Sequence, residues 1–177
     1  MVGVTMRSGG RLALSLLLVC MGGIGAAYAQ QKPTEQDRAA IAQCLAKAKT
    51  TKAAPESCIS AVQGPCLDKP EGQSTVGMRD CANREAAIWD EQLNKGYKAV
   101  LKEYGDADAD GDSGKKLKGA DLIRDAERAW LASREKKCRV AGLQMAGGSG
   151  AGVLIDDCYL YETAHQAIWL NSLVDTP

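Results

Sequence analysis

Six cysteines downstream of residue 30 constrain the fold of this chain more than any other feature of its sequence. They are Cys44, Cys58, Cys66, Cys81, Cys138 and Cys158. No two of them form a Cys-x-x-Cys pair and the chain has a single histidine, His165, so the sequence disfavours a zinc site. An even number of cysteines in an exported protein instead predicts a set of disulfides, which persist in oxidising compartments.

The N-terminus matches a secretory signal peptide. Two arginines precede an apolar run at residues 12–19, which is too short to span a bilayer, and Ala27-x-Ala29 provides a cleavage site. The alternative is a lipoprotein acylated at Cys20, but that processing requires a small residue before the cysteine, and Val19 is branched and bulky. We therefore expect residues 1–29 to be removed and the protein to be periplasmic or secreted.

The mature chain has the charge and length of one near-neutral domain. Loss of Arg7 and Arg11 with the leader leaves 20 basic and 22 acidic residues, a net charge of −2. That balance lacks the basic stripe that binding to nucleic acid or to an anionic membrane requires. The mature sequence also has no second apolar stretch long enough to cross a membrane.

A pair of short helices is predicted at the start of the mature chain. Thr34 can cap the first, with Asp37 in the position of a capping box. Pro55 separates it from a second helix around residues 58–62, and the composition of residues 66–74 is that of a loop. We expect these two helices to form an N-terminal helical hairpin.

Three longer helices are predicted after the hairpin. The first begins at Thr75 and ends before Gly105, and Glu85 is the one polar member of its apolar stripe. The apolar side of the second comprises Leu122, Ile123, Ala126, Trp130, Ser133, Lys137 and Val140. The third extends over residues 154–173. Since no stretch shows sustained strand alternation, the sequence predicts an all-α fold: a small antiparallel helical bundle with an N-terminal hairpin, stapled by disulfides.

The order of the cysteines along these elements suggests how they pair. The predicted disulfides are Cys44–Cys58, Cys66–Cys81 and Cys138–Cys158. The first joins the two short helices across their turn, and the second pins the loop to the start of the longest helix. The third ties the last two helices together where a glycine-rich run connects them.

A run of aspartates, Asp106-Ala107-Asp108-Ala109-Asp110-Gly111-Asp112, lies between two of the long helices. Its opening matches the D-x-D-x-D-G calcium loop, in which alternate carboxylates converge on the ion. The match then fails, because Leu117 stands where the bidentate glutamate belongs and Ser113 where an apolar residue is usual. A flexible acidic linker is the simpler interpretation, and a calcium-dependent structural module of the envelope is the alternative function.

Catalytic motifs are weak. Residues 147–152 are rich in glycine but lack the lysine of a phosphate-binding loop. Ser149 lies near a nucleophile-elbow pattern, yet a serine hydrolase needs a preceding strand and a histidine base, and His165 is expected to pack on the apolar face of the last helix. The pair Asp156-Asp157 begins a helix, where negative charge is favoured. We therefore expect a non-catalytic protein without a metal or cofactor.

An ordered set of residues gives the chain a family resemblance. It comprises Leu93-Asn94-x-x-Tyr97, Ala126-Glu127-Arg128-Ala129-Trp130, Arg134, Cys138, Gly147-Gly148-Ser149, Cys158 and Thr163. Over residues 78–173 this set resembles the domain of the LprI-type lysozyme inhibitors. Two positions depart from the family pattern, because Glu127 replaces a glutamine and Gln166 stands where arginine is frequent.

The resemblance implies a helical envelope domain at residues 67–177, with residues 30–66 as an extension. It also implies a binding partner, either a lysozyme-like glycosidase or another envelope protein, and no catalytic residue. A cationic glycosidase would be steered by acids, for which loops 66–74 and 106–119 are the candidates.

The residues of the family motif are expected to be structural. They are Leu93, Asn94, Tyr97, Arg128, Trp130 and Arg134. Leu93, Tyr97 and Trp130 are expected to meet in the core between the two longest helices. Asn94 and Arg134 are expected to satisfy buried polar groups beside them.

Overall fold

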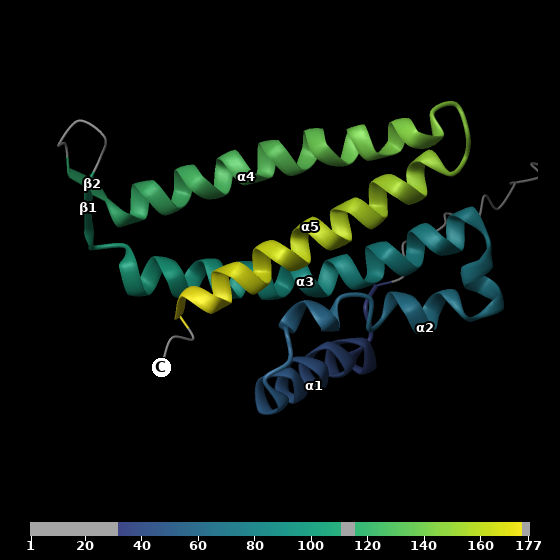
Figure 1. Cartoon of the computed structure of the whole chain (residues 1–177), viewed down its shortest axis with the longest axis horizontal. Helices are drawn as coiled ribbons and strands as arrows, with labels where there is room; N and C mark the ends of the chain where they lie inside the picture. Colours follow the sequence, from purple (N-terminus) through teal and green to yellow (C-terminus); the bar gives the residue numbers. More distant parts are fainter. Residues whose placement is uncertain (1–31, 111–115, 175–177) are drawn as a thin grey trace, which may run out of the picture.

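The computed structural model describes residues 32–110 and 116–174, so the leader, the cleavage site near Ala29 and Asp112 lie outside it. The α-helices are α1 (Glu35–Thr51), α2 (Gln63–Leu67), α3 (Thr75–Tyr104), α4 (Gly119–Gly142) and α5 (Ala151–Val174). The 3-10 helices are η1 (Pro55–Cys58), η2 (Pro70–Gln73) and η3 (Leu143–Met145), and the strands are β1 (Asp108–Asp110) and β2 (Lys116–Lys118). Helices dominate, which confirms the predicted all-α fold. The helices α3, α4 and α5 run back and forth along the long axis of the molecule, each opposite in direction to the one before it (Figure 1).

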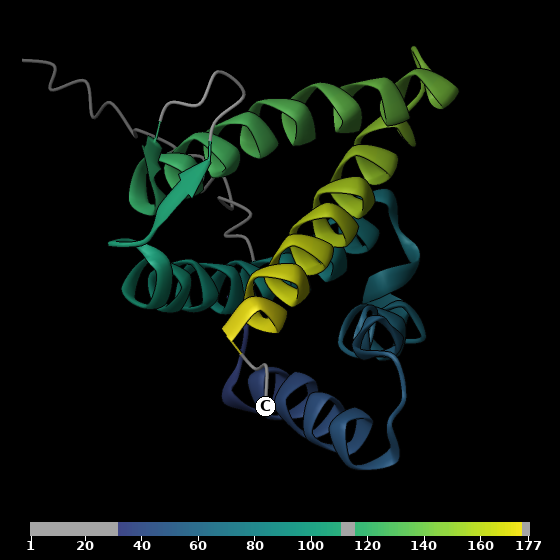
Figure 2. The same cartoon turned by 60° about the vertical axis from the view of Figure 1, so that its left-hand side comes forward.

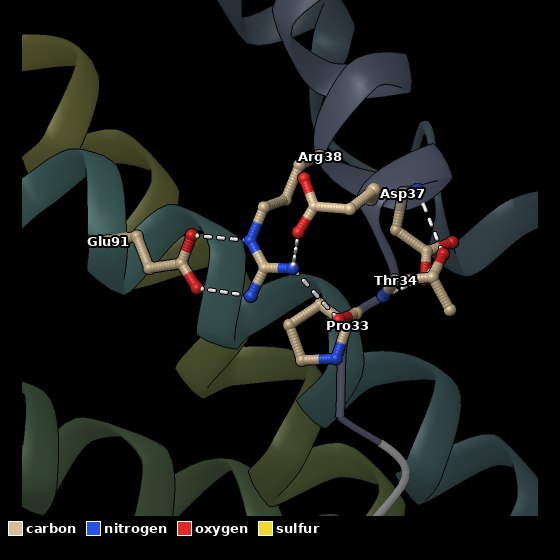
Figure 3. Close-up of polar contacts among 6 residues, drawn as sticks. Pro33, Thr34, Asp37, Arg38 and Glu91 are labelled. Carbon is tan, nitrogen blue, oxygen red and sulfur yellow. Dashed lines mark hydrogen bonds and ion pairs between the residues drawn. The ribbon is translucent and has the colours of Figure 1, made fainter.

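The predicted capping box begins α1 and places it against α3. The Asp37 N–H donates to Thr34 Oγ1 at 3.2 Å, and the Thr34 N–H donates to Asp37 Oδ2 at 2.8 Å. Arg38, one turn after Thr34, forms a bidentate ion pair with Glu91 of α3 (Figure 3). Its Nε and Nη2 donate to the two carboxylate oxygens at 2.9 and 2.8 Å, and its Nη1 donates to the Pro33 carbonyl. The start of α1 is therefore tied to the middle of α3.

The second short helix differs from its predicted position. Residues 58–62 were expected to be helical, but the structure has η1 before them and α2 after them. Between the two, Ser60 adopts the left-handed conformation with φ of 75°, which interrupts a helix. The segment at residues 66–74, expected as a loop, contains the end of α2 and the whole of η2.

A buried carboxylate on α3 fixes this irregular segment. Glu85 has no exposed surface, and its two oxygens accept hydrogen bonds from the backbone N–H groups of Ser60, Val62 and Gln63 at 2.7 to 2.8 Å. The indole Nε1 of Trp89 donates a fourth, at 2.9 Å. A charge can be buried when donors replace its hydration, so this one polar position of the α3 stripe organises the turn between η1 and α2.

The main core lies where α5 crosses α3 (Figures 1 and 2). Ile88 of α3 and Leu160 and Leu170 of α5 are almost fully buried there. The two helices approach closely at Gly96, where an added Cβ would lie 3.1 Å from the Leu170 Cβ. A glycine on α3 and Ala167 on α5 thus permit the tight crossing.

Helix α4 packs much less completely than the sequence suggested. Its only buried residues are Gly119, Cys138 and Gly142. Figures 1 and 2 show α4 along the edge of the molecule opposite α1, with α5 as its main neighbour. One neighbouring helix can cover only one narrow face of α4.

The predicted apolar side of α4 is largely exposed, so that prediction is wrong for most of its members. Leu122 and Val140 have exposed fractions of 46% and 62%. Only Ile123 and Trp130 pack against the core. The face of α4 that contacts α5 is instead lined by polar side chains, which a search for apolar periodicity does not detect.

The aspartate-rich connector forms a β-hairpin, where a flexible linker was expected. Strands β1 and β2 are antiparallel, with Asp108 opposite Lys118 and Asp110 opposite Lys116. Lysine Nζ to carboxylate distances are 2.7 Å for the first pair and 2.6 Å for the second. Opposite charges on facing residues favour this register over an open loop.

Three disulfides join Cys44 to Cys58, Cys66 to Cys81 and Cys138 to Cys158. These are the pairs that the order of the cysteines suggested. The first ties α1 to η1, the second ties α2 to α3, and the third ties α4 to α5. In the part of the chain that the structure describes, no helix is long and apolar enough to span a membrane.

Candidate functional site: the polar seam between α4 and α5

Polar side chains link α4 to α5 along most of their contact. Gln166 Nε2 donates to Glu127 Oε2 at 2.8 Å, and Arg134 Nη1 donates to Thr163 Oγ1 at 2.8 Å. Lys137 of α4 donates to the carboxylate of Glu162, and the Tyr159 hydroxyl of α5 donates to the carboxylate of Glu135. We call this series of contacts the α4–α5 seam.

Arg134 is the centre of the seam. Its guanidinium carbon lies 4.6 Å from the ring centroid of Trp130 and 5.4 Å from that of Tyr159, so two aromatic rings flank the charge. The hydroxyl of Thr163, which accepts from Arg134, also donates to the Tyr159 carbonyl at 2.6 Å. These contacts hold the guanidinium in one position.

A cleft of about 360 Å³ opens beside the seam. The polar residues around it are Arg134, Tyr159 and Thr163 from the seam, Asp80, Asn83 and Asp90 from α3, and Lys32 from the segment before α1. A fixed guanidinium beside aromatic surface and carboxylates can bind a polar ligand or a partner side chain. Arg134 and Thr163, two residues of the family motif, line this cleft.

Glu127 is a seam residue whose pKa is shifted by its partly buried position. Burial raises the pKa of its carboxyl above the ordinary value, against the opposing effects of the Gln166 hydrogen bond and the Arg134 charge. On the exposed side of the seam, hydrogen bonds from Tyr159 and Arg139 lower the pKa of Glu135.

The two departures from the family pattern contact each other. Glu127 replaces a glutamine and Gln166 replaces an arginine, and the structure joins them by a direct hydrogen bond.

The remaining motif residues lie at different depths. Leu93 is buried, and Tyr97 and Trp130 pack against the core. Asn94 was expected to satisfy a buried group, but it is exposed and bonds to Asp90 of its own helix. Arg128 is exposed too.

The sequence did not identify the remaining partners in this seam. Tyr159, Glu162 and Glu135 had no motif that marked them, because their role depends on the packing of α5 against α4. His165, expected to be packed in the core, is exposed on α5.

The aspartate loop does not form a calcium site in the described residues. Asp108 and Asp110 each pair with a lysine across the hairpin, and Asp112 lies outside the described residues. Among those residues, no group of three or more acidic, cysteine or histidine side chains could hold a metal ion. The alternative of a calcium-dependent module therefore has no support.

The segment that contains the α4–α5 seam is similar to a known protein family. The family model described as "Lysozyme inhibitor LprI" matches residues 66–170. An uncharacterized protein of Rhizobium meliloti (strain 1021) is 28% identical over 130 residues, which cover 67% of this chain and 89% of that protein. No solved structure matches significantly. The matched segment includes α3, α4, most of α5 and two of the three disulfides.

Proposed function

The chain belongs to the LprI lysozyme inhibitor family, and on this premise we propose that it is a non-catalytic binding protein of the cell envelope whose partner is a lysozyme-like glycosidase. The observation that carries the proposal is the family match over residues 66–170, more than half of the chain. Three disulfides and the family membership together support a location outside the cytoplasm. Cleavage after Ala29, with a periplasmic or secreted product, is part of the proposal.

Electrostatic attraction contributes little to this proposed binding. The mature net charge is about −2, and lysines pair with Asp108 and Asp110, two of the acids that were expected to steer a cationic enzyme. The affinity must therefore come mainly from contact between apolar surfaces.

The turn between α4 and α5 offers such a surface. Leu143 and Met145 have exposed fractions of 67% and 51%, and residues 140–155 contain no ionisable side chain. Figure 1 shows this turn at one end of the long axis of the molecule, and the Cys138–Cys158 disulfide braces its base. We call residues 143–150 the α4–α5 tip.

The tip suits the cleft of a glycosidase on chemical grounds. Such clefts have two catalytic carboxylates, about 5 Å apart in retaining enzymes, beside apolar surface. These carboxylates would repel an acidic loop of a binding protein, whereas they would not repel an uncharged apolar tip. We propose that the tip contacts the substrate cleft, with the polar seam holding it at a fixed angle.

The proposal is tested by clearing of cell-wall suspensions by a panel of lysozymes, with and without the oxidised mature protein. We expect inhibition of at least one lysozyme, and a loss of at least ten-fold in potency for Leu143→Asp. The matched control is Leu117→Asp, an exposed leucine in the hairpin at the other end of α4, which should leave potency unchanged. Absence of inhibition across the panel would refute the function, and equal potency of Leu143→Asp and the native protein would refute the tip as the contact.

A further inference from the structure

One exposed face of α4 has the properties of a helix–helix contact. Leu122, Ala126, Ala129, Ser133 and Val140 are all exposed. They are separated by four, three, four and seven residues, so they form one straight line along the helix. We call this line the α4 stripe; it is about 27 Å long at 1.5 Å per residue.

The stripe is distinct from the face that binds α5. The seam residues Glu127 and Arg134 and the disulfide-bonded Cys138 lie about a third of a turn around the helix from the stripe. Figures 1 and 2 show α4 at the edge of the molecule, where a second helix has room to approach.

The stripe is complementary to itself when two copies run antiparallel. With a two-fold axis level with residue 131, Leu122 of one copy lies level with Val140 of the second, and Ala129 lies level with Ser133. Apolar ends then meet apolar ends, and the small residues at the centre allow the helix axes to approach closely.

The charges beside the stripe select the same orientation. Asp125 and Lys136 are eleven residues apart, which is close to three whole turns, so both lie on one flank of the stripe. In the antiparallel arrangement each Asp125 comes level, within one residue, with Lys136 of the second copy, and this happens twice. A parallel two-fold arrangement would instead place this flank of the two copies on opposite sides of the interface, so Asp125 of one copy could not reach Lys136 of the second. The present partner of Asp125 is Arg128 in an exposed ion pair, which costs little to exchange.

We propose that α4 is a homodimerisation helix, and that its partner is a second copy of this chain bound antiparallel along the α4 stripe. A contact along one helix face is small beside a standard stable interface, which buries roughly 800 Å² per partner, so we expect the dimer to be weak and reversible. The inference does not depend on the glycosidase, because the α4–α5 tips remain at the outer ends of the paired helices.

Sedimentation velocity of the oxidised mature protein, from about 1 µM to 1 mM, tests the proposal. We expect a reversible monomer–dimer equilibrium, which Ala129→Arg abolishes. Leu131→Arg is the matched control, because Leu131 is exposed on the opposite face of the same helix, with an exposed fraction of 43%, and this change should leave association intact. Circular dichroism of each variant verifies that it is folded.

Charge exchange tests the orientation. Asp125→Lys should weaken the dimer at least ten-fold, and the double variant Asp125→Lys/Lys136→Asp should restore it. A protein that stays monomeric at 1 mM overturns the proposal. Association that Leu131→Arg abolishes and Ala129→Arg leaves unchanged, or that the double variant fails to restore, overturns the assigned face or orientation.

Discussion

At the scale of single residues, Glu85 joins the N-terminal segment to the long helices. Its carboxylate accepts four hydrogen bonds, three of them from the backbone between η1 and α2. The sequence marks Glu85 only as a polar interruption of an apolar stripe. Its partners could not be predicted, because the backbone that donates to it has no regular structure of its own.

Replacing this carboxylate should destabilise the protein strongly. In Glu85→Gln, the side-chain amide brings N–H donors against backbone N–H groups, and the charge that strengthens the remaining bonds is lost. We expect a loss of about 3 kcal/mol in the free energy of unfolding. Urea denaturation of the oxidised protein measures it, with the exposed Glu103→Gln as the control. Equal midpoints for the two variants would contradict this role for Glu85.

Replacing the carboxylate of Glu127 should raise the free energy of unfolding, whereas replacing that of Glu85 should lower it. Because burial raises the pKa of its carboxyl in the folded protein, the ionised form costs stability at pH values above that raised pKa. The cost disappears as the pH falls below the ordinary value, where folded and unfolded states are both protonated. Glu127→Gln should therefore stabilise the protein at pH 7, and by much less at pH 4.

Urea midpoints of the native protein and of Glu127→Gln, measured at both pH values, test this prediction. Other carboxyls titrate in the same range, but they do so equally in the two proteins and cancel in the difference. A difference that is the same at pH 4 and pH 7 would show that ionisation of Glu127 is not its cause.

At the scale of elements, prediction succeeded where one helix face is buried against apolar neighbours. The longest helix was expected from Thr75 to the residue before Gly105, and α3 spans Thr75–Tyr104. Its bounds follow from local signals, a regular apolar stripe and a C-terminal glycine. For α4 the same reasoning failed, because the face in contact with α5 is polar and the apolar face is exposed.

The β-hairpin was not predicted from the sequence, for a related reason. Strands of three residues are too short to show alternation, and their register depends on pairs between aspartates and lysines. Read along the sequence, the same residues resemble an acidic linker. Of the candidate site, Arg134, Trp130 and Thr163 were identified through the family motif, whereas the contacts of Tyr159 with Arg134 and Glu135 required the structure.

The disulfide between α4 and α5 should control the position of α4. In the double variant Cys138→Ser/Cys158→Ser, loss of a cross-link that closes a loop of 20 residues should cost about 3 kcal/mol. Because α4 has few other buried contacts, we expect faster amide hydrogen exchange in α4 and little change in α3. Non-reducing peptide mapping of the native protein should first recover Cys138 bonded to Cys158. Mapping that found Cys81 bonded to Cys158, or uniform loss of protection in the variant, would contradict this account.

At the scale of the whole molecule, the crossed pair of α3 and α5 is a rigid support for two appended parts. On one side, the N-terminal segment from α1 to η2 is tied down by Arg38, by Glu85 and by two disulfides. On the other, α4 stands along an edge, held by polar contacts and one disulfide, and ends in the exposed α4–α5 tip. This arrangement suits a protein that presents a fixed surface to a partner.

The central claim is that the protein inhibits a lysozyme by stoichiometric binding, and titration of enzyme activity tests it most directly. A fixed concentration of a susceptible lysozyme, well above the dissociation constant, is mixed with increasing amounts of the oxidised mature protein. The account predicts that residual activity falls linearly, reaches its minimum near one equivalent and does not change with longer incubation. Progressive inactivation by substoichiometric protein would indicate a catalytic mechanism and contradict the claim, and so would full activity at a large molar excess for every lysozyme tested.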